Sequence, residues 1–67
     1  MDQLTPEAIE LVKRNNALFF EITETWKRNR GSIYRWLLQN RRPELTHPRT
    51  IRIIEKYNTE NIQIVQS

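Results

Sequence analysis

The sequence predicts an all-α fold, in which residues 1–67 form one small domain built as a bundle of four to five helices. Apolar residues recur at spacings of three and four along most of the chain, which is the period of an amphipathic helix. Prolines and asparagines separate these runs. A chain of this length buries only about 60% of the surface that its unfolded form exposes, so we expect one core and no separate catalytic domain.

The first helix is predicted to begin in the stretch TPEA at residues 5–8. The Thr5 hydroxyl can accept a hydrogen bond from a free amide of the first turn, and Pro6 suits the first helical position. Glu7 favours the positive end of the helix dipole. Its apolar stripe contains Ala8, Ile9 and Val12, with Leu11 beside it.

The second helix is predicted over about residues 17–25, after a break at the pair Asn15-Asn16. Its apolar residues Leu18, Phe19, Ile22 and Trp26 follow one another at spacings of one, three and four. A nearly continuous helix across the break remains an alternative.

The third helix is predicted from near Arg30 to about Asn40, after a turn between Lys27 and Arg30, and Pro43 is expected to stop it. One side carries an apolar stripe at i, i+3 and i+4, formed by Ile33, Trp36 and Leu37. A second stripe follows spacings of four and three and is polar throughout: Arg28, Ser32, Arg35, Gln39 and Arg42. We expect the apolar side to face the core and the polar side to face outward.

The fourth helix is predicted to begin at Thr46 or His47, with Pro48 in its first turn, after a loop PELTHP. It has two apolar edges, one formed by Ile51, Ile54 and Tyr57 or Asn58, and the other by Ile53 with Tyr57. Two apolar edges on one short helix indicate that the helix is either deeply buried or in contact with a partner molecule. In the tail, Ile62 and Ile64 alternate as in a strand, but a last short helix capped by Thr59 is the interpretation that we favour.

Positive charge is concentrated in the middle of the chain. Residues 1–24 have a net charge of −3, residues 25–52 of +7, and residues 53–67 of −1. Of the eight positively charged residues in the middle segment, all but one are arginine. The planar guanidinium of arginine binds phosphate and guanine with two parallel hydrogen bonds. This distribution predicts a polyanionic partner.

Several classes of function are disfavoured. With no cysteine and one histidine, His47, a metal site has almost no ligands, and His47 is expected to start a helix instead. No nucleophile has an evident base and no glycine-rich phosphate loop is present, so we expect neither enzymatic activity nor a cofactor. The apolar runs are shorter than the roughly 20 residues that span a bilayer, and the first residues do not follow the signal-peptide pattern, so we expect a cytoplasmic protein.

The segments LFFEITETW, KRNR and GSIYRWLLQN have the layout of a helix-turn-helix, in which the second helix enters the major groove of DNA while the first braces it. Ile22, Trp26, Ile33 and Trp36 lie where such a unit needs internal apolar contacts. Thr23, a small residue, lies where the two helices approach most closely.

On these residues the chain resembles the lambda-repressor-like, Cro/repressor type of DNA-binding domain. GSIYRWL stands where that family has its recognition helix. The resemblance covers the layout of residues 6–66 and the motif of residues 20–42. It implies sequence-specific binding to double-stranded DNA, usually as a homodimer on two half-sites, and regulation of transcription in bacteria or phage, with the protein on the nucleoid when bound.

The resemblance also implies roles for individual residues. The expected base-reading residues are Asn29, Arg30, Ser32, Tyr34, Arg35 and Gln39, and the expected phosphate contacts are Lys27, Arg28, Gly31, Arg41 and Arg42. The chemistry fits, since arginine pairs with guanine, and asparagine and glutamine pair with adenine. The chain departs from the family in Lys27, where the turn often has glycine, in Arg28, where it often has an apolar residue, and in Phe19-Phe20, where phosphate-contacting polar residues are common.

Other interpretations remain open. A protein-interaction module of the antirepressor or antitoxin kind would use the same fold to hold an acidic protein, and Ile53 and the apolar tail fit it as well as they fit homodimerisation. RNA binding and membrane association of residues 27–42 are disfavoured, because both need aromatic or apolar residues that the core requires. Arg49 and Arg52 are either a solvated face or binding residues, and Tyr34 either contacts DNA or covers Leu38.

Overall fold

The chain folds into two layers of helices that pack across each other. The structure is a computed structural model and describes residues 3–66. Its elements, in chain order, are β1 (Gln3–Leu4), α1 (Pro6–Arg14), α2 (Asn16–Trp26), α3 (Arg30–Gln39), the 3-10 helix η1 (Pro43–Thr46), α4 (Pro48–Tyr57) and β2 (Val65–Gln66). The prediction of a small, mainly helical bundle is confirmed.

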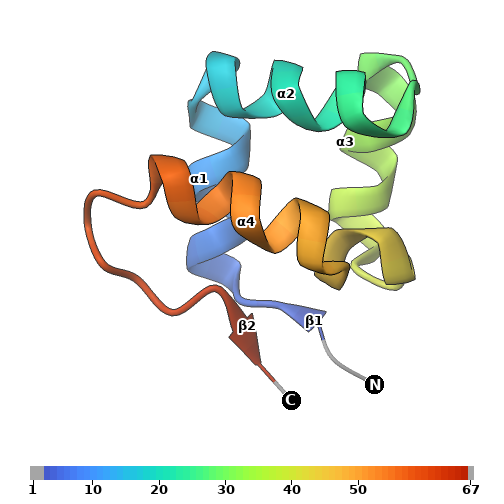
Figure 1. The fold of residues 1–67 in the computed structure, drawn as a ribbon. Helices are drawn as coiled ribbons and strands as arrows, with labels where there is room; N and C mark the ends of the chain where they lie inside the picture. Colours follow the sequence, from blue (N-terminus) through green and yellow to red (C-terminus); the bar gives the residue numbers. More distant parts are fainter. Residues whose placement is uncertain (1–2, 67) are drawn as a thin grey trace.

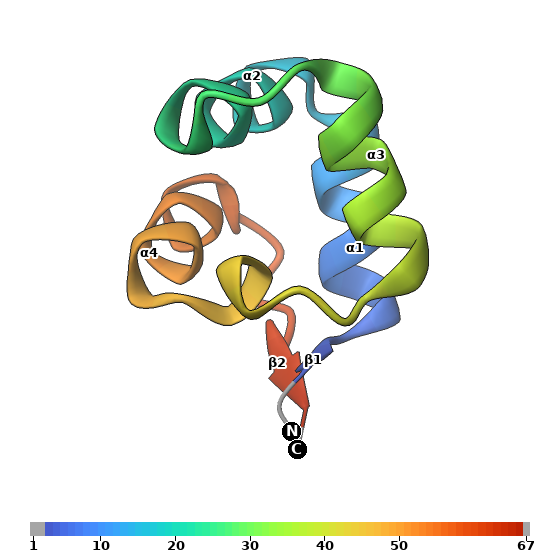
Figure 2. The same ribbon diagram turned by 90° about the vertical axis from the view of Figure 1, so that its right-hand side faces the viewer.

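Two layers are visible when the molecule is seen from the side. α2 lies above α4 in one layer, and α1 and α3 form the other (Figure 2). Within each layer the two helices run in opposite directions, so that α2 joins the top of α1 to the top of α3 (Figure 1). α2 contacts the other three helices and is therefore the central element of the bundle.

Each of the four α-helices begins with a side chain that accepts a hydrogen bond from the first turn. The Thr5 hydroxyl accepts from the Ala8 amide over 3.1 Å, and Asn15 Oδ1 accepts from the Leu18 amide over 3.1 Å. His47 Nδ1 accepts from the Arg49 amide over 3.1 Å. The expected starts at Thr5 and His47 are confirmed, and Asn15 separates α1 from α2 as two helices.

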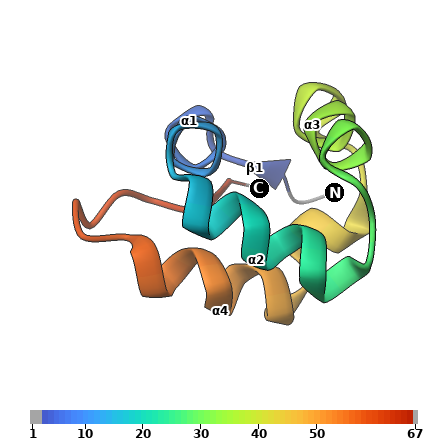
Figure 3. The same cartoon turned by 90° about the horizontal axis from the view of Figure 1, so that it is seen from above.

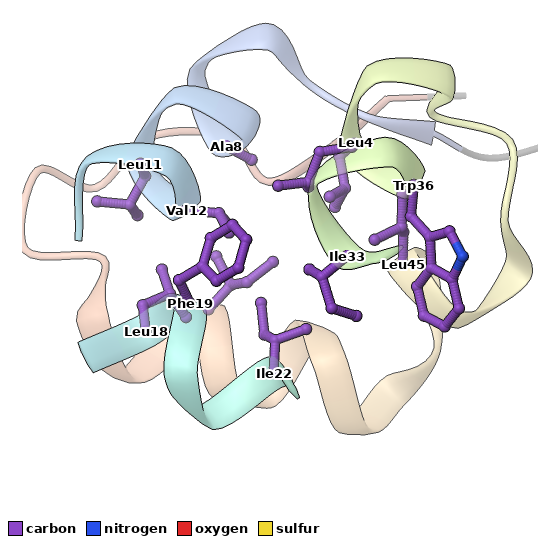
Figure 4. Packing of buried hydrophobic residues seen from close by; sticks show 12 residues of the cluster. Leu4, Ala8, Leu11, Val12, Leu18, Phe19, Ile22, Ile33, Trp36 and Leu45 are labelled. Atoms are coloured by element: carbon purple, nitrogen blue, oxygen red, sulfur yellow. The ribbon is translucent and has the colours of Figure 1, made fainter. Parts of the chain in front are cut away.

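The core lies between the layers and receives apolar side chains from every helix (Figure 4). Its buried apolar members are Leu4, Ala8, Leu11, Val12, Leu18, Phe19, Ile22, Ile33, Trp36, Leu37, Leu45 and Ile54. One fully buried polar residue, Thr50, was not predicted. Its hydroxyl donates to the Glu44 carbonyl over 2.6 Å and accepts from Trp26 Nε1 over 2.9 Å.

The tail does not form the expected last helix. After α4 the chain is extended, and β2 pairs antiparallel with β1 in the register Gln3↔Gln66 and Leu4↔Val65. The favoured interpretation of residues 59–67 is therefore wrong for the described part, and residue 67 lies outside it. The tail forms a strand because the backbone amides and carbonyls of β1 and β2, which would otherwise lack partners, hydrogen-bond to each other.

The end of α3 also differs from the prediction in detail. The helix ends at Gln39, and Asn40 follows in the left-handed conformation with φ 51°, so the stop precedes Pro43. Asn40 is held by β1, because its side chain accepts from the Leu4 amide over 3.2 Å and donates to the Leu4 carbonyl over 2.9 Å. The segment expected to be a loop begins with η1. Within residues 3–66, no helix has the length and apolar character needed to cross a bilayer.

Candidate nucleic-acid interface

The connection between α2 and α3 is a tight turn of three residues, 27–29. Lys27 adopts the left-handed conformation, with φ 53° and ψ 45°. The Thr23 carbonyl accepts from the amides of both Lys27 and Arg28, which closes the end of α2. Lys27 thus has the backbone conformation that favours glycine, at the position where glycine was expected from the resemblance.

Asn29 begins α3. Its Oδ1 accepts from the Ser32 amide over 2.8 Å, so the side chain caps the helix. A bidentate contact with adenine needs both the oxygen and the nitrogen of the amide group. The cap and the predicted base contact of Asn29 therefore compete for the same oxygen.

The rotation of α3 is fixed by its apolar side. Ile33, Trp36 and Leu37 are all buried, as predicted. Directly opposite them, at i, i+4 and i+7, lie Gly31, Arg35 and Leu38. The surface of α3 is thus centred on Arg35. α3 itself lies at one edge of the molecule, in the layer that does not contain α4 (Figure 3).

The predicted polar stripe follows one margin of this surface. Arg35 and Gln39 are exposed, whereas Ser32 is half-buried. The other side of the surface is apolar, since Tyr34 is 47% exposed and Leu38 is 63% exposed. Leu38 is a surface residue that the sequence analysis did not assign to the interface, although its position three residues after Arg35 could have indicated it.

A second group of side chains forms a small pocket beside the start of α3. The pocket has a volume of about 340 Å³ and is lined by Lys13, Phe19, Arg30, Gly31 and Tyr34. The guanidinium carbon of Arg30 lies 5.0 Å from the centre of the Phe19 ring. Lys13 Nζ lies 5.4 Å from the centre of the Tyr34 ring. Both cations are therefore held over aromatic rings next to the exposed surface of α3.

Lys13 is the functional candidate that the sequence analysis missed. It belongs to α1 and to the acidic first part of the chain, and only the packing of α1 beside α3 brings its charge to this surface. No local pattern marks it.

The predicted phosphate contacts divide into free and engaged residues. Lys27, Arg28 and Arg41 are exposed, and within residues 3–66 none of them forms an ion pair. Arg42 is engaged instead: its Nη2 lies 2.9 Å from Glu44 Oε2, and its guanidinium carbon lies 4.6 Å from the centre of the Trp36 ring.

The hydrogen bond from Arg42 also affects the acidity of its partner, Glu44. The hydrogen bond from Arg42 lowers the pKa of the Glu44 carboxyl below its ordinary value of 4.5, and the nearby charge of Arg28 acts in the same direction. Arg42 is therefore paired with a carboxylate of the same chain, whereas Arg41 forms no ion pair within residues 3–66.

Among the described residues, no group of three or more histidine, aspartate or glutamate side chains is arranged to hold a metal ion. His47 caps α4, and its ring packs edge-on against Trp26 at a centroid distance of 5.3 Å.

Comparison of the chain with protein-family models, with curated proteins and with solved structures found no match.

Proposed function

We propose that this protein is a sequence-specific double-stranded DNA-binding regulator of transcription, which places α3 in the major groove in the manner of the lambda-repressor-like, helix-turn-helix domains that its sequence resembles. The observation that carries the proposal is the exposed surface of α3. There the side chains of Arg35 and Gln39 are exposed, and within residues 3–66 neither side chain forms a hydrogen bond or an ion pair with the rest of the chain.

The shape of α3 supports the proposal. The major groove admits an α-helix, provided that one whole side of the helix is free. α3 meets this condition, because its buried residues lie on one side and the opposite side is uncovered. α2 and the three-residue turn then act as the brace of a helix-turn-helix.

The chemistry of the surface supports base reading. Arg30 and Arg35 can each donate two parallel hydrogen bonds to guanine, and Gln39 can pair with adenine. Tyr34 and Leu38 add apolar surface, which suits the methyl group of thymine. Arginines and an amide beside apolar groups distinguish base pairs, whereas a purely basic surface would read only the phosphates.

The flanking charges support binding to the backbone of the duplex. Lys27 and Arg28 precede α3 and Arg41 follows it, so positively charged residues lie at both ends of the helix. Each phosphate contact releases counterions and makes the affinity fall with salt. These residues set the position of α3, and repression then follows from occupation of the site.

Selection of bound duplexes from a random pool tests the proposal. We expect one preferred site, palindromic if the protein binds as a homodimer, with an affinity that falls steeply as salt is added. Equal binding to every duplex would contradict the proposal and leave a nonspecific DNA-binding role.

Variants of Arg35 give the sharper test. Arg35→Ala should lose about 1–3 kcal/mol of preference at one base pair of each half-site. Arg35→Lys keeps the charge but not the two-pronged donor geometry, so it should lose the same preference with little change in salt dependence. If both variants keep the preferred site unchanged, the base-reading surface is not centred on Arg35.

A further inference from the structure

A second basic surface lies in the other layer of the molecule. A groove with a volume of about 440 Å³ runs between α2 and α4 and is lined by Thr25, Arg49, Arg52, Ile53 and Lys56. α3 belongs to the opposite layer, so the groove is separate from the proposed DNA surface (Figure 2).

The groove combines an apolar centre with a cationic rim. Arg49, Arg52 and Lys56 follow one another at i, i+3 and i+7 along α4, and Ile53 lies among them. Ile53 is half-buried and packs against the core, so its exposed part is a fixed apolar surface.

The charges of Arg49 and Arg52 are not compensated within residues 3–66, since neither side chain forms an ion pair there. Lys56 differs, because its Nζ lies 3.0 Å from Glu21 Oε2. Arg49 also stands in the first turn of α4, which holds no acidic residue, and a cation at this end of a helix is opposed by the dipole. A carboxylate from another molecule would pair with these arginines and would also offset the unfavourable interaction of Arg49 with the helix dipole.

We propose that this groove binds an acidic segment of a partner protein, in which carboxylates flank an aliphatic side chain. The carboxylates pair with Arg49 and Arg52 at the rim, and the aliphatic side chain packs on Ile53. Arginine is suited to this role because it forms bidentate pairs with carboxylates and is weakly hydrated. The proposal does not depend on DNA binding by α3.

Nuclear magnetic resonance of the isotope-labelled protein tests it, with a capped synthetic peptide of Glu-Glu-Leu repeats as the probe. We expect saturable shifts of the backbone amides of Thr25, Ile53 and Lys56. A Lys-Lys-Leu peptide should cause no shift, and a Glu-Glu-Ser peptide should bind more weakly, because it has charge but no apolar side chain.

The double variant Arg49→Glu/Arg52→Glu should weaken binding of the acidic peptide by about tenfold or more. Both residues are exposed, and a glutamate in the first turn of α4 suits the dipole, so the fold should be retained. Lys27→Glu/Arg41→Glu makes the same change of net charge at two exposed basic residues outside the groove. It is the matched control and should bind the acidic peptide as strongly as the parent protein does, whatever its effect on DNA binding.

Four outcomes would overturn the proposal. The first is that the peptide shifts amides of α3 instead of those of the groove, and the second is that the double variant and the control bind the acidic peptide equally well. The third is that the Glu-Glu-Ser peptide binds as strongly as the Glu-Glu-Leu peptide. The fourth is that the groove amides shift with protein concentration alone, which would assign the groove to a second copy of the chain.

Discussion

Trp26 and Thr50 are joined by a hydrogen bond that ties the end of α2 to α4. Trp26 Nε1 donates to Thr50 Oγ1 over 2.9 Å, and the same hydroxyl donates to the Glu44 carbonyl over 2.6 Å. One buried oxygen thus satisfies two groups from different elements. Because Trp26 directly precedes the turn into α3, this bond helps to set where the proposed recognition helix begins.

Replacing Thr50 with valine should destabilise the fold by about 1–3 kcal/mol, because the Trp26 indole and the Glu44 carbonyl would both lose a partner. Thr50→Ser keeps the hydroxyl and should lose clearly less. Chemical denaturation of the two variants measures the difference. No loss in Thr50→Val together with a clear loss in Thr50→Ser would mean that packing of the methyl group, and not the hydroxyl, is what matters.

Lys27→Gly should stabilise the fold by about 1 kcal/mol, since the left-handed conformation of residue 27 costs glycine little. Lys27→Ala removes the same charge but keeps the Cβ atom, so it should not share the gain. Both variants should lose DNA affinity to a similar degree if Lys27 contacts phosphate. Thermal denaturation and DNA titration of the pair separate the backbone effect from the charge effect.

Gly31→Ala should raise stability and lower DNA affinity. A Cβ atom at residue 31 would meet only Asn29 Oδ1, at 3.5 Å, which is an ordinary contact. Alanine in a helix is favoured over glycine by about 0.5–1 kcal/mol. The added methyl group would nevertheless project from the exposed side of α3 and hold a phosphate away from the backbone. Unchanged DNA affinity would contradict the close approach predicted for Gly31.

Lys13→Ala should weaken binding to all duplexes by a similar factor and reduce the slope of affinity against salt by about 1, as expected for the loss of one phosphate contact. Arg14→Ala is the matched control, because Arg14 is the next residue and pairs with Glu60. Fluorescence anisotropy at several salt concentrations provides the measurement. If both variants behave alike, Lys13 acts only through net charge.

Acidification should weaken the fold through Glu44. Its pKa is lowered in the folded protein by the hydrogen bond from Arg42, so the ion pair contributes stability above the ordinary value of 4.5. That contribution is lost as the pH falls through the lower, folded-state value. Glu44→Gln should remove this contribution to the pH dependence of stability, whereas the control variant Glu7→Gln should retain it. Denaturation midpoints between neutral and acidic pH give the comparison.

The helices could be predicted from the sequence because their signals are local. Thr5 and Pro6 mark the start of α1 by their own chemistry, and the buried side of α3 follows from the spacing of Ile33, Trp36 and Leu37. The short sheet could not be predicted, since the pairing of Leu4 with Val65 depends on residues at opposite ends of the chain.

In the candidate site, too, features set by the local sequence could be predicted, whereas features set by the packing of separate elements could not. Arg35 and Gln39 were placed correctly on the surface of α3 because the helical period alone determines their side. Lys13 and the pairing of Arg42 with Glu44 were missed, since both depend on how separate elements pack. Leu38 was missed because an apolar residue was assumed to be needed by the core.

The contact between Asn40 and Leu4 makes one amide proton a reporter of the far end of α3. The Leu4 amide donates to Asn40 Oδ1, and Leu4 is fully buried, so its exchange with solvent deuterium requires this contact to open. The rate of that exchange therefore measures how often β1 and the residue that ends α3 separate, at a position that the proposed DNA surface does not include.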